Sequence, residues 1–250
     1  MLMINNEIGN KLIKLSSVDS TNNYAAKLIK QTKVPYGTVI MARHQTKGRG
    51  QRNGIWDAKE DSNLLISIIL NMHFLPPDKI FFLSKIAALA LHSTINQFGL
   101  QSYIKWPNDL VVNKKKLAGI LIENQWVGQN VKSSIIGIGL NVNQDVFPES
   151  FNATSLKLLT SRFFDIEDVL KVLCQYLNEF FNQLIDLSYE KIDLSYHKYL
   201  INYNQWAEFK ENNISFNAKV KGVNEQGELI LELDNGDEKS FELKQLTQMI

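Results

Sequence analysis

The sequence predicts an α+β protein, in which a mixed β-sheet flanked by helices is followed by a small all-β module. Three observations support this prediction. Apolar runs typical of buried strands alternate with longer helical patterns, and several strands are close enough in sequence to form hairpins rather than βαβ units. Near residue 204 the pattern changes to short alternating runs broken by turns. We therefore expect a larger domain over residues 1–203 and a small β module over residues 204–250.

The first half of the chain should contain a capped helix, two strands and a long helix. Asp19 or Ser20 can cap a helix through "DSTNNYAAKLIKQ", whose apolar residues fall on one face. A strand is expected at 37–43. The apolar run "NLLISIIL" at 63–70 is typical of a strand covered on both faces. Residues 76–99 read as a buried helix that prolines open and a glycine ends.

The second half should complete the sheet and then add helices. "SYIKWPNDLVVNKKKLAGILIE" predicts a strand, a turn, a short strand, a hairpin tip near Asn113 and Lys114, and a further strand. Residues 133–143 predict one more strand. Helical patterns follow at about 166–187 and 189–204. The remaining residues contain "EQGE" and the strong hairpin signal "DNGD".

Composition places the chain among soluble globular proteins. Its 250 residues are 44% hydrophobic and 21% charged, with a net charge of +1, which argues against general nucleic-acid binding. The single Cys174 excludes an internal disulfide and fits a core position. The N-terminus does not resemble a signal peptide, and the apolar runs are shorter than the ~20 residues that cross a bilayer. We expect a cytoplasmic protein without membrane contact.

The stretch "KGRGQRNGIW", residues 47–56, is unusually basic and rich in glycine. Its glycines allow the backbone to approach a ligand closely, and Arg49 and Arg52 are suited to bind carboxylate or phosphate. Trp56 could provide a stacking surface. The stretch is neither a P-loop nor a dinucleotide fingerprint. The alternative is a solvated surface loop whose exit is anchored by a buried Trp56.

Two further motifs contain polar groups next to a strand. In "KWPNDL", Asn108 and Asp109 follow a proline, and their oxygens could hold Mg²⁺, although Asn-Asp is also ordinary turn chemistry, which is the favoured interpretation of these residues alone. In "NKKKLAGI", three lysines could simply make an edge soluble. Lys116, however, stands where the strand enters the core and could neutralise a buried anion, with Gly119 allowing a ligand to lie against the strand.

The strand "IIGIGLNVN" has glycines at 137 and 139, which would clear one face of a buried strand. This spacing could form the floor of a groove, or it could allow a helix to pack on the strand. Asn141 and Asn143 share one side by alternation and could donate to a nucleotide. The histidines lack metal-ligand spacing, and no Gly-x-Ser-x-Gly elbow is present. The combined motifs suit attack of a carboxylate on a nucleoside triphosphate, where anionic charge must be neutralised.

Five motifs, "DSTN", "QTKGRGQRNGIW", "KWPNDL", "KKLAGILIE" and "GIGLNVN", occur in the order and approximate spacing of the biotin protein ligases. The sequence resembles that family over residues 19–143. The resemblance implies a class II synthetase-like catalytic domain followed by an SH3-like β-barrel module. It also implies that biotin and MgATP form biotinyl-5′-AMP and pyrophosphate. A lysine of a biotin carboxyl carrier protein, or of the carrier domain of a carboxylase, then takes the biotinyl group.

The resemblance also assigns expected roles to residues. Glycine-rich residues 48–52 would fold over biotin and the adenylate. Asn108 would help to hold Mg²⁺. The residues expected to bind biotin are Ser20, Thr21, Asn22, Gln45, Gly48, Arg49, Gly50, Gln51, Lys116 and Gly119. Those expected to bind ATP or the adenylate are Arg52, Trp56, Lys116 and Asn141, and those expected to be catalytic are Lys116, Arg52 and Arg49.

The sequence departs from the family pattern at Gln51, where many members have a second arginine, and here the arginine comes next, at Arg52. Eighteen residues precede "DSTN", too few for a DNA-binding helix-turn-helix domain, so we expect a ligase without operator binding. A free edge of the catalytic sheet could pair in a homodimer.

Three alternatives remain open. Lipoate or octanoate ligases and transferases use a related fold, but a lipoyl tail has no ureido group for residues 20–22 and Gln45 to bind. A binding module, such as a carrier-protein scaffold or an RNA binder, would need neither an inward lysine nor a Mg²⁺ turn. A catalytically weakened paralogue is the third alternative, because of Gln51. Release of pyrophosphate with biotin would indicate a biotin ligase, release with lipoate would indicate the neighbouring family, and no release with either would point to a binding role or a weakened paralogue.

Overall fold

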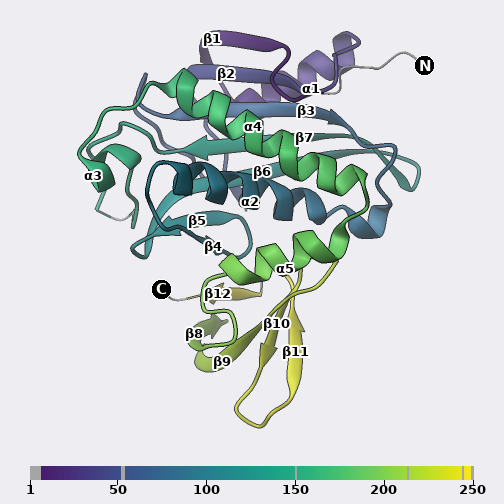
Figure 1. Ribbon diagram of the computed structural model, residues 1–250, viewed down its shortest axis with the longest axis vertical. Helices are drawn as coiled ribbons and strands as arrows, with labels where there is room; N and C mark the ends of the chain where they lie inside the picture. The colour runs from purple at the N-terminus through teal and green to yellow at the C-terminus, as the bar shows by residue number, and fades with distance from the viewer. Residues whose placement is uncertain (1–6, 52–53, 150, 213, 244, 249–250) are drawn as a thin grey trace.

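A seven-stranded mixed sheet forms the centre of the larger part of the chain (Figure 1). The computed structural model describes residues 7–51, 54–149, 151–212, 214–243 and 245–248. The strand order is β1-β2-β3-β7-β6-β5-β4; β1 and β2 are parallel and the other neighbours antiparallel. The elements are β1 (Leu12–Val18), α1 (Thr21–Gln31), β2 (Thr38–Gln45), β3 (Leu64–Asn71), α2 (Phe82–Gln97), β4 (Tyr103–Lys105), β5 (Asp109–Val112), β6 (Lys115–Val127), β7 (Asn130–Leu140), α3 (Leu156–Thr160), α4 (Ile166–Ile185) and α5 (Tyr189–Tyr199).

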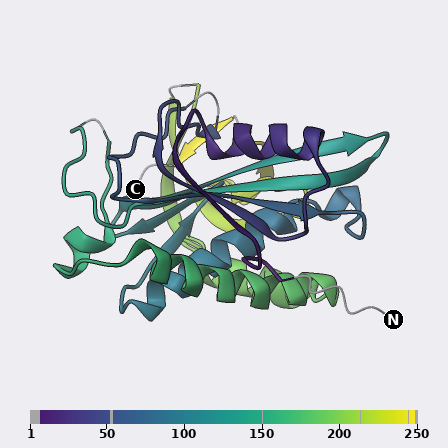
Figure 2. The same ribbon diagram turned by 90° about the horizontal axis from the view of Figure 1, so that it is seen from above.

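Helices cover both faces of this sheet (Figure 2). On one face α2 and α4 pack against it and form the main core, and on the other face α1 packs with Ala25 against a smaller apolar cluster. Strand β3 is buried on both faces from Leu64 to Leu70, as its continuous apolar run predicts. None of the helices in the described ranges is long and apolar enough to span a membrane.

The C-terminal residues form a separate five-stranded antiparallel sheet, and the α+β prediction is confirmed. Its strand order is β11-β10-β9-β8-β12. The predicted division at residue 203 falls in the turn that precedes β8, and it stays a prediction. The strands are β8 (Trp206–Glu211), β9 (Ile214–Val223), β10 (Leu229–Glu232), β11 (Glu238–Phe241) and β12 (Leu246–Gln248).

Several elements differ from the sequence-based expectations. Helix α2 begins at Phe82 rather than at the prolines, where only a short 3-10 turn, Pro77–Lys79, forms. Strand β1 was not expected, because it lies at the sheet edge and its residues are largely exposed. The short helix α3 was also not expected; Ser155 caps it through its hydroxyl. Helix α5 ends at Tyr199 rather than near residue 204, because Leu200 is extended and Asn202 has a positive φ. The hairpin tip at residues 113–114 is confirmed, with positive φ at both residues.

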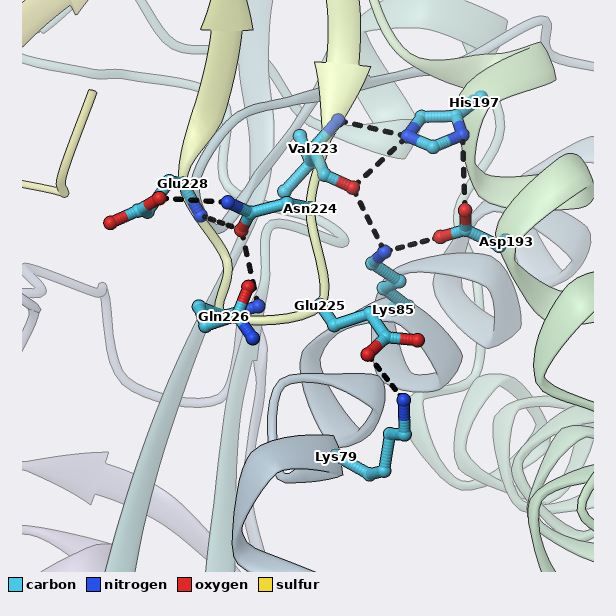
Figure 3. Close-up of polar contacts among 9 residues, drawn as sticks. All are labelled: Lys79, Lys85, Asp193, His197, Val223, Asn224, Glu225, Gln226 and Glu228. Carbon is cyan, nitrogen blue, oxygen red and sulfur yellow. Dashed lines mark hydrogen bonds and ion pairs between the residues drawn. The ribbon is translucent and has the colours of Figure 1, made fainter. Parts of the chain in front are cut away.

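The two sheets are joined by a buried polar cluster between α2, α5 and the end of β9 (Figure 3). Lys85 on α2 has a fully buried side chain, forms an ion pair with Asp193 and donates to the carbonyl of Val223 at 3.1 Å. His197 accepts a hydrogen bond from the Val223 N–H at 2.8 Å through Nε2. A second ion pair links Lys79 to Glu225. The C-terminal sheet is therefore anchored by charged and backbone groups rather than by apolar contact alone.

The turn between β9 and β10, which includes Glu225 and Gly227, also contacts the "KWPNDL" motif. The indole N–H of Trp106 donates to the carbonyl of Gly227 at 2.9 Å, and Trp106 is 3% exposed. Gly227 has a φ of +90°, and a Cβ there would lie 2.3 Å from the ring of Phe81. Only glycine fits this position. The C-terminal sheet thus contacts the segment that leads to Asn108.

We expect removal of Asp193 to destabilise the fold more than removal of Lys85. Asp193→Ala leaves the Lys85 ammonium buried without its carboxylate, which should lower the free energy of unfolding by about 3 kcal/mol. Lys85→Met replaces the lysine with an unbranched apolar side chain that fills similar space. The Asp193 carboxylate that it leaves unpaired is 37% exposed and can be hydrated, so less stability is lost. Urea unfolding of the two variants measures the difference. An equal or larger loss in Lys85→Met would contradict this account.

His92 on α2 is a buried neutral histidine. It is 2% exposed, and its Nδ1 lies 3.0 Å from the Ser102 hydroxyl. Its Nε2 lies 2.9 Å from the side-chain nitrogen of Asn96. Because an amide nitrogen only donates, Nε2 accepts and the ring is uncharged. Burial lowers the pKa of His92 to about 4.

Stability should therefore fall on acidification. The folded-state pKa of His92 lies below the unfolded value, so the unfolded chain binds more protons between pH 6.5 and about 4. As the pH falls through this window, His92 alone should lower the free energy of unfolding by about 2 to 3 kcal/mol. His92→Gln should be less stable at neutral pH but show a flatter decline in urea unfolding across the window. Parallel declines in both proteins would show that His92 is not responsible.

Candidate functional site

Two paired strands, β6 and β7, lack side chains where the floor of the site lies. Gly139 on β7 pairs with Gly119 on β6, and a Cβ on Gly139 would lie 2.3 Å from the indole ring of Trp56. A Cβ on Gly137 would lie 2.4 Å from the Asn22 side-chain oxygen. At Gly139 the missing side chain makes room for Trp56 above the floor, which supports the interpretation as a groove. At Gly137 it makes room for Asn22 of helix α1, which supports the alternative that a helix packs on the strand.

One wall of the site consists of hydrogen-bonded polar side chains at the start of α1. The side-chain oxygen of Gln45, at the end of β2, accepts from the Thr21 N–H at 2.8 Å and from the Thr21 hydroxyl at 3.1 Å. The hydroxyl of Ser67 lies 2.7 Å from the Thr21 hydroxyl and 2.6 Å from the Asn22 side-chain oxygen. Asn22 in turn donates to Glu123 at 2.7 Å. These bonds fix the orientation of each amide.

Ser20 precedes α1 but its side chain does not cap the helix. The Asp19 carboxylate accepts instead from the Ser20 N–H at 2.8 Å and from the Asn23 side chain at 2.9 Å. Ser20 is 2% exposed, so its hydroxyl lies at the buried end of the site and is not used for capping. Of the two expected capping residues, Asp19 therefore stabilises the start of α1 through side-chain bonds and Ser20 does not.

The glycine-rich stretch forms a small hairpin over the site. Arg49 pairs with Ile55 as an antiparallel bridge, and the Trp56 N–H donates to the Gly48 carbonyl at 3.0 Å. A Cβ on Gly48 would lie 2.2 Å from the Trp56 carbonyl oxygen, so the close pairing requires glycine. This pairing places the Trp56 ring against Gly119 and Gly139 of the sheet. Arg52 and Asn53, which belong to the predicted loop, lie outside the described residues.

Arg49, which we expected to act as a catalytic cation, is paired with a carboxylate. Its Nη2 donates to Glu123 at 2.8 Å, and its Nη1 donates to the Asn23 side-chain oxygen, also at 2.8 Å. Glu123 lies on β6 and was not identified from the sequence. The charge of Arg49 is thus largely neutralised in this arrangement.

Lys116 enters the site beside Trp56. Its ammonium lies 5.5 Å from the centre of the indole ring and 2.7 Å from the Asp109 carboxylate. A bulge between Leu110 and Val111 shifts the β5–β6 register just before Lys116, and the backbone N–H of Lys116 donates to Asn152 at 2.8 Å. The site therefore contains a lysine on a fixed backbone, with its ammonium paired to a carboxylate.

Two hollows meet at Trp56 and Lys116. The inner hollow, with a cavity volume of about 50 Å³, lies above the glycine floor. The outer hollow, of about 280 Å³, lies between Trp56 and Phe151 and includes Asn141. The predicted site residues around the inner hollow are Ser20, Thr21, Asn22, Gln45, Arg49, Gly50, Gln51, Trp56, Asn108, Lys116 and Gly119. Of the others, Asn141 lies in the outer hollow, and Gly48 lines an open groove on the outer side of the hairpin.

The asparagines that could contact a nucleotide or a metal have different surroundings. Asn141 donates to the Thr154 carbonyl at 3.0 Å and still faces the outer hollow. The Asn143 side chain donates to the Phe164 carbonyl and accepts from the Phe164 N–H, so both ends of its amide are used within the fold. Asn143 therefore does not share the site with Asn141, as strand alternation had suggested. Asn108 donates to the Ile120 carbonyl at 2.9 Å, and its amide oxygen accepts no hydrogen bond from the described residues.

The sequence analysis did not identify Glu123 or Ser67 as site residues, and it did not identify Asp109 as the partner of Lys116. Glu123 follows the apolar run "LAGILI", and Ser67 interrupts "NLLISIIL". A polar residue within a run that is buried on both faces needs a hydrogen-bond partner, which is the signal that could have identified Ser67. Asp109 was considered as a possible metal ligand, but its contact with Lys116 depends on the bulge.

Comparison with known proteins agrees with this geometry. The model of the biotin/lipoate A/B protein ligase family matches residues 15–141, about half of the chain. The bifunctional ligase/repressor BirA of Bacillus spizizenii is 32% identical over 239 residues, covering 94% of this chain and 73% of the relative. The biotin–[acetyl-CoA-carboxylase] ligase of Mycobacterium tuberculosis is 34% identical over 124 residues, covering 48% of this chain and 45% of the relative.

Similarity to solved structures extends over nearly the whole chain. The biotin protein ligase of Aquifex aeolicus, solved in complex with biotin and ATP, superposes with a TM-score of 0.79 at 26% identity. The superposition covers 96% of this chain and all of the Aquifex chain, including the C-terminal sheet. The chain belongs to the biotin/lipoate A/B protein ligase family, and within that family to the biotin protein ligases.

Proposed function

We propose that this protein activates biotin as biotinyl-5′-AMP with MgATP and transfers the biotinyl group to a lysine of a biotin carrier domain. The observation that carries the proposal is the junction of two hollows at Lys116, one bounded by polar side chains and one by aromatic side chains. The inner hollow suits the ureido ring of biotin. The outer hollow suits the nucleoside.

The polar wall provides donors for the ureido carbonyl. Thr21 occupies both acceptor positions of the Gln45 side-chain oxygen, which leaves the Gln45 amide nitrogen as a donor. The Ser20 hydroxyl is a second donor at the same end. One ureido N–H can donate to the remaining lone pair on the Asn22 side-chain oxygen. A lipoyl ring would leave these buried groups without partners, which favours biotin.

Lys116 lies where the biotin carboxylate would meet the α-phosphate. In the first step a carboxylate oxygen forms a bond to the α-phosphorus, the bond between this phosphorus and the oxygen that bridges to the β-phosphate breaks, and pyrophosphate leaves. Lys116 would stabilise the negative charge that both reactants bring to this point. Asn141 and Trp56 would lie beside the nucleoside. Arg52 is proposed from the motif alone.

In the second step the acceptor lysine amine attacks the biotinyl carbonyl carbon, and AMP leaves with the electrons of the C–O bond. The hairpin over the inner hollow would keep water from the mixed anhydride until the acceptor arrives. The backbone positions of Gly48, Gly50 and Gln51 would cover biotin. We place this reaction in the cytoplasm, with ATP and the carboxylase.

Asn108 is the residue that we propose to help hold Mg²⁺. Its amide oxygen lies at the inner hollow and is not used by another described residue. No group of three or more His, Cys, Asp or Glu side chains that could hold a metal is present among the described residues, so most Mg²⁺ ligands would be phosphate oxygens and water. Bound Mg²⁺ would neutralise the phosphate charge.

We expect purified protein to release pyrophosphate from MgATP with biotin and not with lipoate. Lys116→Ala should lower this rate by on the order of 10² to 10³, because charge stabilisation at the reacting oxygens is lost. A coupled pyrophosphate assay measures both. The matched control is Lys115→Ala, since Lys115 is an exposed neighbour that lines neither hollow. Release with lipoate would assign a lipoate ligase, and an unimpaired Lys116→Ala enzyme would remove that role.

Ser67→Ala should weaken biotin binding without changing the fold. Its hydroxyl is the group that contacts both Thr21 and Asn22 from beneath, and Ser67 itself is fully buried. Loss of this bond should raise the KM for biotin about tenfold while the KM for ATP stays constant. Ser134→Ala is the control, because Ser134 is equally buried on β7 but pairs with Asn124 away from both hollows. Equal effects of the two substitutions would argue against a role in recognition.

A further inference from the structure

We propose that Glu123 is a positioning residue that clamps the glycine-rich hairpin over the site and so retains the biotinyl adenylate. The retention of the adenylate rests on the proposed function, whereas the contacts that hold the hairpin belong to the fold itself. Glu123 contacts no reacting group of the proposed reaction. It acts through Arg49 of the hairpin and Asn22 of the polar wall.

The Glu123 carboxylate receives donors from two separate segments. One oxygen accepts from Arg49 Nη2 at 2.8 Å, and the other accepts from the Asn22 side chain at 2.7 Å, with Arg49 Nη1 at 3.3 Å. The guanidinium is thus held in a bidentate manner, the geometry in which arginine–carboxylate pairs are strong. Arg49 also donates to Asn23, which Asp19 holds in turn.

These contacts lie at the rim of the inner hollow. Asn22 and Arg49 both line it, whereas Glu123 stands behind them on β6. The Glu123 and Arg49 side chains are 34% and 44% exposed, so the pair is partly shielded from water rather than free on the surface. A partly shielded, bidentate pair with further hydrogen bonds should hold the hairpin where an isolated exposed pair would not.

Loss of Glu123 should have two linked effects. Arg49 would lose its carboxylate and keep only its hydrogen bond to Asn23, so the described hairpin residues would be held by that bond, by backbone pairing and by the packing of Trp56 on the sheet. Asn22 would lose the acceptor that orients its amide. The proposed chemical step depends on Lys116, which does not contact Glu123, and should proceed at a similar rate.

The test compares formation of the adenylate with its escape. In Glu123→Ala we expect the rate of adenylate formation at saturating biotin, measured as a pyrophosphate burst with MgATP, to change less than about threefold. The KM for biotin should rise, because Asn22 loses the acceptor that orients its amide. Escape of preformed adenylate, measured as free biotin and AMP after dilution without acceptor, should accelerate about tenfold, the effect of one charged hydrogen-bonded contact. Arg49→Ala should show the same acceleration, and the double variant should add nothing further.

The matched control is Asp61→Ala, which removes the ion pair of Arg43 and Asp61. That pair is likewise an arginine–carboxylate contact, in which Arg43 of β2 meets Asp61, but neither residue lines the inner hollow. Adenylate escape in Asp61→Ala should equal that of the unmodified protein. Additive effects in the double variant, or equal acceleration in Asp61→Ala, would overturn the clamp.

Limited trypsin digestion tests the clamp independently of activity. Cleavage after Lys47 and Arg49, identified by mass spectrometry, should be faster in Glu123→Ala than in the unmodified protein or in Asp61→Ala. If the unmodified protein releases no pyrophosphate with biotin, the proposed function fails, and faster cleavage still supports the clamp. Unchanged cleavage in Glu123→Ala would refute it, whether or not the protein is a biotin ligase.

Discussion

The absence of side chains at the centre of the β6–β7 pair is the constraint on which the rest of the site depends. Gly139 and Gly119 lie opposite each other, and a Cβ at Gly139 would overlap the Trp56 ring. Gly137 creates the same room for Asn22. With larger residues at these positions, neither the hairpin nor the start of α1 could approach the sheet, and the hollows would not have their present walls.

A second constraint is that the two described cations at the site each face a carboxylate. Arg49 is paired with Glu123, and Lys116 is paired with Asp109. Neighbouring Lys105 is partly buried, and its burial lowers its pKa while Asp109 opposes this effect. An anionic substrate therefore does not enter an unbalanced positive site. Under the proposed function it would compete with Asp109 for Lys116, and under the proposed clamp Glu123 would hold Arg49 and with it the hairpin.

The C-terminal sheet is part of the same construction. Trp106 connects the "KWPNDL" segment to Gly227, and the Lys85 cluster fixes the adjoining strand end at Val223. Asn108 and Asp109 follow Trp106 within three residues. The position of the proposed Mg²⁺ ligand and of the partner of Lys116 therefore depends on how the second sheet is anchored.

The sequence by itself determined the fold class, most of the elements and the identity of the polar side chains that line the inner hollow. These features depend on local patterns: apolar periodicity, turn residues and short motifs such as "KWPNDL". Edge strand β1 and helix α3 could not be predicted, because their stability comes from pairing and packing rather than from periodicity. Cys174 is partly buried and packs against the edge of the main core rather than within it, and this burial raises the pKa of its thiol to about 11.

Only the tertiary structure decided how the site residues are used. Arg49 pairs with Glu123, which lies 74 positions away in the chain, rather than standing free for a phosphate. Gly137 makes room for Asn22, 115 positions away, rather than for a ligand. Ser67 and Glu123 become part of the site through strand register alone. Local sequence determines which groups are available, but hydrogen-bond geometry, which acts over about 3 Å, assigns their partners only when the strands are assembled.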